Sequence, residues 1–221
     1  KSSGRVSETG KKPLMGAAQR LINESAIKDG KTIYQLICDQ YKGRERGRVL
    51  LEAFGFLGET NPRLAVELLK ALPEGEDKYV LYAQAIWACH KFESLRILFD
   101  GIGDVNLEFR STLNAAVQSA LGRLTSDELA NLADSMPVGW RTMIDTSRYQ
   151  TMGKEGAVSK FDALLATMPD WSRRQANENF ITGLARTDVA TALSRLRETP
   201  DSPPSPEISS LVAGTLYAED R

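Results

Sequence analysis

The sequence predicts an all-α fold built from stacked antiparallel helix hairpins. Amphipathic segments end in a proline at near-regular places, and the intervals between these prolines are 64, 32 and 31 residues: Pro73, Pro137, Pro169 and Pro200. Between the prolines, apolar residues recur at the spacing of helices. A fixed period of about 32 residues built from helices is typical of arrays in which each unit buries its apolar face against its neighbours. One degenerate copy of this unit is expected between the first two prolines.

Length and composition agree with a folded helical array. The chain has 221 residues, of which 42% are hydrophobic, enough to bury a substantial core. Its net charge of −1 provides no general attraction to nucleic acid or to anionic membranes. No apolar run approaches the roughly 18 to 20 residues of a membrane span, so we expect a soluble protein without membrane insertion. The chain begins at Lys1, which leaves both a cytoplasmic protein and a periplasmic or secreted one with its signal removed as interpretations.

Two segments are predicted along the chain. Residues 1–12 are small, polar and charged, and are expected to form a flexible tail. Residues 13–221 are expected to form a single helical-repeat domain, which opens with a helix pair divided by Asp29 and Gly30. A proline-rich stretch follows Thr199, and the chain stops half a repeat later, so a terminal cap and a fragment of a longer array are both consistent with the pattern.

Helix start signals recur at matching places in the repeat. Asn61 is a natural N-cap, and Pro62 suits the first helical position. Thr125 opens a capping box with a glutamate three residues later. In a later copy, Thr187 or Asp188 is expected to cap the helix. Short loops between antiparallel neighbouring helices are expected throughout.

The same pattern predicts helix ends and core positions. In the degenerate copy, Gly101 and Gly103 are expected to end a helix in place of proline, and Asn106 to cap the next one. The first helices of the hairpins are expected at 79–91, 140–151, 172–186 and from residue 207 onward. Core positions lie four and five residues before each proline: Leu68, Leu69, Leu132, Ala133, Leu164, Leu165, Arg195 and Leu196.

Three further kinds of residue are expected to serve packing. Trp87 has apolar neighbours on every side and is predicted to lie in the core. Gly55 and Gly58 are expected to allow close packing or capping. Cys38 and Cys89 are expected to be buried thiols, with a disulfide as the alternative.

No residue pattern indicates catalysis. His90 and Cys89 are adjacent, and adjacent side chains on a helix point about 100° apart, so they do not suit a catalytic pair. His90 is instead expected to interact with carbonyls at a helix end. Cysteines and histidine together number three, fewer than the four ligands of a structural zinc site. We therefore predict a non-enzyme with no catalytic residue, cofactor or metal, although paired carboxylates in a glycan-acting enzyme are an alternative.

Two tryptophan–arginine clusters are the predicted partner-binding residues. Trp140 and Arg141 lie about one repeat before Trp171, Arg173 and Arg174. Tryptophan and arginine are the residues most enriched where binding energy concentrates. An interaction edge and two tryptophans packed back into the hairpin core are equally consistent with the pattern.

A basic stretch precedes the first repeat. Lys42, Arg44, Arg46 and Arg48 are interspersed with Glu45. Nucleic-acid binding would require these residues to share a surface with the arginines of the second half. We favour a charged loop between two helices, and nucleic acid is an unlikely partner.

The repeat resembles a known style of protein. A helix is followed by T-N-P or R-T-D and then by A-x-x-x-L-x-x-L-P, over residues 60–73 and 186–200. This pattern resembles degenerate tetratricopeptide or HEAT-like α-solenoids, and is closest to the short D-P-x-x-A helical repeats of large bacterial proteins of unknown function. The strict tetratricopeptide positions are not met. The resemblance implies a right-handed superhelix that serves as a scaffold for a protein or peptide, and HEAT-like nucleic-acid binding as an alternative.

Overall fold

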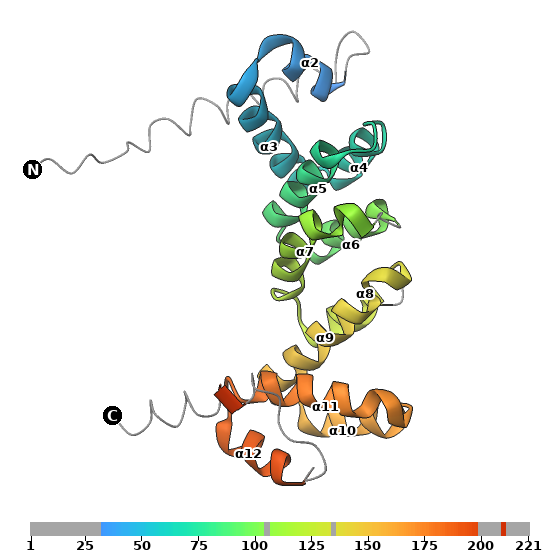
Figure 1. Cartoon of the computed structure of the whole chain (residues 1–221), viewed down its shortest axis with the longest axis vertical. Coiled ribbons are helices and arrows are strands. Elements are labelled where there is room, and N and C mark those ends of the chain that lie inside the picture. The colour runs from blue at the N-terminus through green and yellow to red at the C-terminus, as the bar shows by residue number, and fades with distance from the viewer. Residues whose placement is uncertain (1–31, 104–106, 134–135, 199–208, 211–221) are drawn as a thin grey trace, which may run out of the picture. The chain divides into compact units, whose positions relative to one another are not determined.

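The computed structural model describes residues 32–103, 107–133, 136–198 and 209–210 (Figure 1). Eleven helices, α2 to α12, lie in these ranges, and the described residues contain no strand, so the all-α prediction is confirmed. The predicted tail, the first helix of the opening pair, the cap at Asn106, the proline-rich stretch and most of the last helix lie outside the described residues. Contacts divide the chain into two compact units, Lys1–Ala120 and Leu121–Arg221. The single helical-repeat domain stays a prediction.

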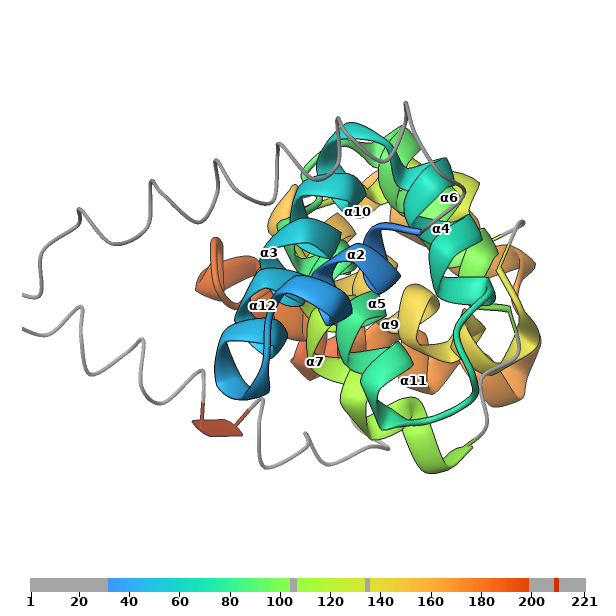
Figure 2. The same cartoon turned by 90° about the horizontal axis from the view of Figure 1, so that it is seen from above.

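The helices of unit 1 alternate between two layers. They are α2 (Ile33–Gln40), α3 (Gly43–Thr60), α4 (Pro62–Lys70), α5 (Glu76–Ala88), α6 (Phe92–Ile102) and α7 (Leu107–Leu121), whose last residue already belongs to unit 2. Helix α3 packs against α5, and α4 packs against α6, while each helix from α3 to α5 also contacts the next one. Seen from above, α4 and α6 lie together on one side of α3 and α5 (Figure 2).

Unit 2 shows the same alternation of long and short helices. It consists of α8 (Ser126–Ala133), α9 (Val138–Lys154), α10 (Val158–Thr167), α11 (Asp170–Leu184) and α12 (Val189–Glu198). The long helices α9 and α11 pack against each other. Helix α8 contacts α9, α12 contacts α11, and α10 contacts both long helices.

Local capping explains where several helices begin. The Leu64 N–H donates to Oδ1 of Asn61 (3.2 Å), and Pro62 is the first residue of α4, as predicted. Thr125 and Glu128 form the predicted capping box, with the Thr125 N–H donating to Oε2 of Glu128 (2.8 Å) and the Glu128 N–H donating to Oγ1 of Thr125 (3.3 Å). These hydrogen bonds satisfy amide groups that the helix itself leaves without partners.

At three other helix ends the structure either decides between two predicted residues or differs from the prediction. Asp188, not Thr187, caps α12, since its Oδ1 accepts from the Thr191 N–H (3.0 Å). Gly103 ends α6 with a φ of 61°, whereas Gly101 is a buried residue inside that helix. The predicted charged loop at residues 42–48 is wrong, because Lys42 is the N-cap of α3 and the residues after it form its first turns. Arginine and glutamate favour helix once a helix begins beside them.

Glycines allow the long helices of each unit to approach closely. A Cβ atom on Gly58 of α3 would lie closer than 3.0 Å to the backbone of Ala85 in α5. A Cβ atom on Gly153 of α9 would clash in the same way with the backbone of Phe180 in α11. Gly58 and Gly153 are 95 positions apart, and so are Ala85 and Phe180. The same helix–helix contact therefore occurs in both units, and the predicted packing role of Gly58 is confirmed.

A half-buried arginine packs against the core of unit 2. The rings of Phe161 and Phe180 stack with centroids 4.0 Å apart, and the Arg195 guanidinium lies 5.0 Å from the Phe180 centroid. Arg195 also donates from Nε to Oδ1 of Asn177 (3.0 Å) and pairs with Asp162. The charge is thus matched by a carboxylate, an amide and two ring faces, which explains how arginine occupies a predicted core position.

The remaining predicted core positions also face inward. Leu69 and Leu132 are fully buried. The others are half-buried: Leu68, Ala133, Leu164, Leu165 and Leu196.

The glycine contact leads to a stability prediction. Gly58→Ala is expected to lower the free energy of unfolding by about 1–3 kcal/mol or more, because the new methyl group meets rigid backbone of α5. Gly47→Ala in the same helix, where an added Cβ would meet nothing within 4 Å, is expected to raise it by about 0.5–1 kcal/mol. Urea denaturation followed by far-ultraviolet circular dichroism measures both. Equal effects of the two substitutions would contradict the role assigned to Gly58.

Candidate binding groove

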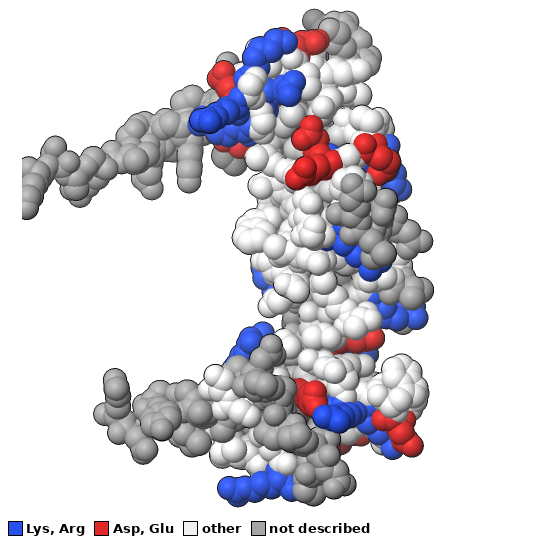
Figure 3. All heavy atoms as spheres, viewed as in Figure 1, with Lys and Arg blue, Asp and Glu red and all other residues white. Residues whose placement is uncertain are grey.

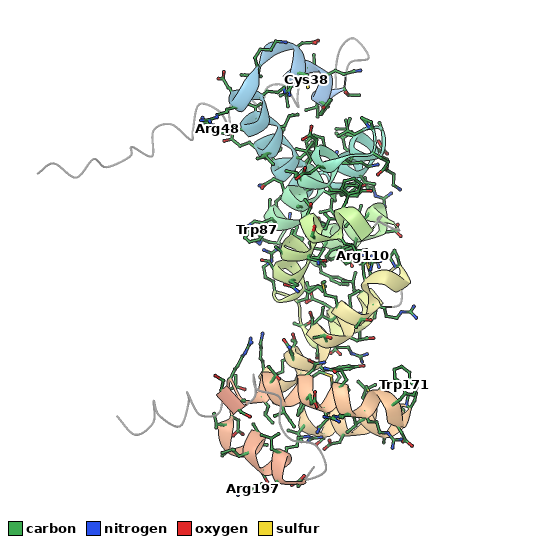
Figure 4. The ribbon with its side chains drawn as sticks, in the orientation of Figure 1. Cys38, Arg48, Trp87, Arg110, Trp171 and Arg197 are labelled. Carbon is green, nitrogen blue, oxygen red and sulfur yellow. The ribbon has the colours of Figure 1, made fainter. Side chains whose placement is uncertain are left out.

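A shallow, mostly apolar groove lies on unit 1. Its volume is about 360 Å³, and three helices line it: α3 through Leu51, α5 through Val80, Ala83, Gln84 and Trp87, and α7 through Thr112, Ala115 and Ala116. We call this feature the α3–α5–α7 groove. Trp87 is 53% exposed, an unusual position for so large an apolar side chain, and it projects away from the ribbon (Figure 4). The groove is therefore an apolar concave surface beside a half-exposed tryptophan in the described part of this unit.

The prediction that Trp87 lies in the core is wrong. Helix α5 carries apolar residues on two opposite faces. Tyr82, Ala85 and Ile86 are buried in the core, whereas Val80 and Trp87 line the groove. Because the helix is apolar on both faces, its sequence periodicity does not distinguish the buried face from the groove face.

An aromatic and ionic cluster fixes α5 beside α7. The Tyr79 ring stacks on Phe109 of α7 with a centroid distance of 4.8 Å. The Tyr79 hydroxyl donates to Oε2 of Glu74 (2.7 Å), and Lys78 Nζ pairs with Oε1 of the same carboxylate (2.5 Å). The hydrogen bonds from Lys78 and Tyr79 lower the pKa of Glu74, while burial and the bond to Glu74 raise the pKa of Tyr79 to about 12. This cluster holds two walls of the groove together.

The corresponding face of unit 2 has different chemistry. The glycine contacts relate the two units by a shift of 95 positions. Applied to four apolar residues of the groove, Leu51, Val80, Ala83 and Trp87, the shift gives Thr146, Gln175, Glu178 and Thr182. Each apolar side chain thus has a polar counterpart. The four apolar positions of the groove are consequently specific to unit 1.

The two predicted tryptophans lie in different environments. Trp140 is 1% exposed and belongs to the core, whereas Trp171 is 85% exposed. Trp140 precedes the contact glycine of its helix, Gly153, by 13 positions, but Trp171 precedes Gly183 by 12. One position turns a side chain by about 100° around a helix, so Trp171 corresponds structurally to Arg141. Of the two interpretations that the sequence allowed, packing into the core holds for Trp140. Trp171 is exposed, as an interaction edge requires.

The arginines beside Trp171 make contacts within unit 2. Arg173 donates from Nε to the Met168 carbonyl at the end of α10 (2.9 Å), and it pairs with Asp170 (2.8 Å). Arg174 Nε pairs with Oε1 of Glu178 one turn along α11 (3.1 Å). Arg173 satisfies an end carbonyl, a common role of basic side chains at helix C-termini.

The residues considered for chemistry have structural contacts. Cys38 and Cys89 form no disulfide, and Cys89 is buried. The His90 backbone N–H donates to Oε2 of Glu59 (2.9 Å). The expected contact of the His90 side chain with helix-end carbonyls stays a prediction. Within the described ranges, no group of three or more His, Cys, Asp or Glu side chains is placed to hold a metal ion.

The two alternative functions remain predictions. Burial raises the pKa of Asp145, and the charged groups acting on this carboxylate are Arg148 and Arg141, not a second acid of a glycosidase pair. The basic residues at 42–48 lie in unit 1, whereas Arg141, Arg173 and Arg174 lie in unit 2.

Comparisons with known proteins identify no relative of this chain. No family model matches the chain, and searches of curated proteins and of solved structures find no match either. Within the part of the chain that was described, no helix has the length and apolar character needed to cross a bilayer.

The contrasting exposure of two tryptophans leads to a second prediction. Trp140→Ala is expected to lower the free energy of unfolding by about 3–5 kcal/mol, because it empties a filled core position. Trp87→Ala is expected to change it by less than about 1 kcal/mol, because the side chain is half in solvent. Denaturation midpoints of the two variants measure the difference. Equal losses would show that Trp87 belongs to the core after all.

The Glu74 cluster leads to a prediction about pH. A lowered carboxyl pKa contributes stability that is present at neutral pH and is lost as the pH falls through that pKa. Glu74→Gln is therefore expected to lower the urea midpoint at pH 7, and the difference from the parent chain is expected to shrink at pH 3. Glu76→Gln makes the same chemical change at an exposed side chain two positions away and is the matched control. A difference that does not vary with pH would contradict the assigned role of the carboxylate.

Proposed function

We propose that this protein is a non-catalytic scaffold that binds a protein or peptide segment in the α3–α5–α7 groove. The observation that carries the proposal is the half-exposed Trp87 beside an apolar groove lined by three helices. In this proposal the helices belong to a right-handed solenoid of hairpins with about 32 residues per repeat, as the sequence pattern predicts.

The repeated glycine contact supports the solenoid. A shift of 95 positions is close to three units of the period predicted from the prolines. Within each unit, long helices contact long helices while the shorter helices pack beside them. Stacked hairpins produce this arrangement, because each hairpin buries its apolar face on the next.

The chemistry of the groove supports peptide binding. Small side chains at Ala83, Ala115 and Ala116 leave room for an incoming side chain, and Trp87 supplies a large flat surface beside them. Gln84 and Thr112 supply the few polar groups that such sites use to orient a ligand. Tryptophan loses little conformational entropy on binding and often dominates interface energetics. The edge around Trp171, Arg173 and Arg174 that the sequence predicts is the alternative contact surface, in place of the groove.

Selection from a phage-displayed random peptide library on the intact chain tests the proposal. Enriched peptides, resynthesised with a fluorescein label, are expected to bind the parent chain and to bind the Trp87→Ala variant at least about tenfold more weakly. Trp171→Ala removes the other exposed tryptophan and is the matched control, for which no change is expected. Failure to enrich any peptide would contradict the proposal. Peptides sensitive to Trp171→Ala alone would move the site to the edge predicted from the sequence.

A further inference from the structure

Two arginines extend the groove face of α3. Arg48 and Arg44 precede Leu51 by three and seven positions, and residues at these spacings share one face of a helix. Both side chains are exposed. In Figure 4, Arg48 and Trp87 project toward the same side of unit 1. The apolar groove is therefore continued by positive charge toward the beginning of α3.

The positive charge at the start of α3 is concentrated in a few residues, and two of its arginines form no ion pair within the described part of the chain. Residues 42–48 contain four basic residues and one acidic residue, Glu45. Figure 3 shows basic side chains gathered over the first turns of α3. Lys42 donates from Nζ to the Cys38 carbonyl (3.3 Å), whereas Arg44 and Arg48 have no ion pair with any residue that the structure describes. Exposed guanidinium groups bind carboxylates in a bidentate manner and lose little hydration in doing so.

We propose that the partner of the groove is an acidic peptide segment with a bulky apolar residue. The apolar side chain packs between Leu51 and Trp87, and the carboxylates lie against Arg44 and Arg48. This inference rests on the proposed function and adds the chemical class of the partner. Apolar contact supplies most of the affinity, while the charges select the partner and its direction in the groove.

A peptide fits these residues better than a nucleic acid does. Trp87 is the single aromatic residue among those that line the groove, so the groove offers one stacking surface where single-stranded nucleic acids use several. The chain as a whole has a net charge of −1, which disfavours a long polyanion. A short acidic segment requires only the local charge of α3.

Three synthetic peptide libraries test the inference on the intact chain. They share a randomised apolar centre and differ only in flanks of Glu, of Gln or of Lys. The Glu library is expected to yield the tightest binders, with dissociation constants measured by fluorescence anisotropy of labelled peptides that rise as salt is added. The double variant Arg44→Glu with Arg48→Glu is expected to weaken the Glu peptides at least about tenfold.

Arg46→Glu is the matched control for this charge reversal. Arg46 lies in the same turns of α3, but it is five positions from Leu51 and so points to another side of the helix. A change of less than about threefold is expected for it, since only long-range screened charge is altered. An equal loss in Arg46→Glu and in the double variant would overturn the assignment of Arg44 and Arg48.

The remaining outcomes separate this inference from the proposed function. Equal, Trp87-dependent binding of the three libraries would overturn the preference for acidic peptides and leave the proposed function standing. Absence of Trp87-dependent binding in all three would overturn both. A labelled oligothymidylate that displaces the Glu peptides and binds more tightly than they do would overturn the inference in favour of nucleic acid.

Discussion

Helix α3 can approach α5 so closely only because Gly58 has no side chain, and the rest of unit 1 depends on that approach. The Gly58 position lies directly against the backbone of Ala85, so neither helix can slide or rotate without a clash. The register set there brings Leu51 of α3 beside Val80, Ala83 and Trp87 of α5. Gly153 makes the same contact with Phe180 in unit 2. Glycines at these contacts therefore set how closely the long helices of each unit pack, and in unit 2 Gly183 of α11 approaches the backbone of Gln150 in α9 as well.

Polar clusters complete this packing without weakening it. Arg195 occupies a core position in unit 2 because two aromatic faces, an amide and a carboxylate satisfy its charge. In unit 1, Glu74 joins Lys78 and Tyr79 in a similar network, and the Tyr79 ring reaches α7. Both networks tie together helices that the glycine contacts alone do not hold. The outward faces of the helices can therefore carry different side chains in the two units while the helix packing beneath them stays the same.

That difference is the basis of the functional proposal. Related positions carry apolar residues in unit 1 and polar residues in unit 2, although the backbone contact beneath them is the same. In the proposal, helices held by these contacts present the groove and the adjacent arginines ready for a segment, which would reduce the entropic cost of association. The proposal assigns binding energy to the groove and selectivity to the arginines of α3, so different side chains would carry the two properties.

The sequence by itself determined the all-α class and the capped starts of α4 and α8, because capping and helical periodicity are local properties of the chain. It left two residues open as the cap of α12 and two roles open for Gly58, and the structure decided both. Only the tertiary structure decided which tryptophan is buried. Trp140 and Trp171 differ by one position relative to the contact glycines, and Trp87 lies on a helix with two apolar faces. A sequence pattern shows that a face is apolar, but whether another helix covers that face depends on contacts between residues far apart in the chain.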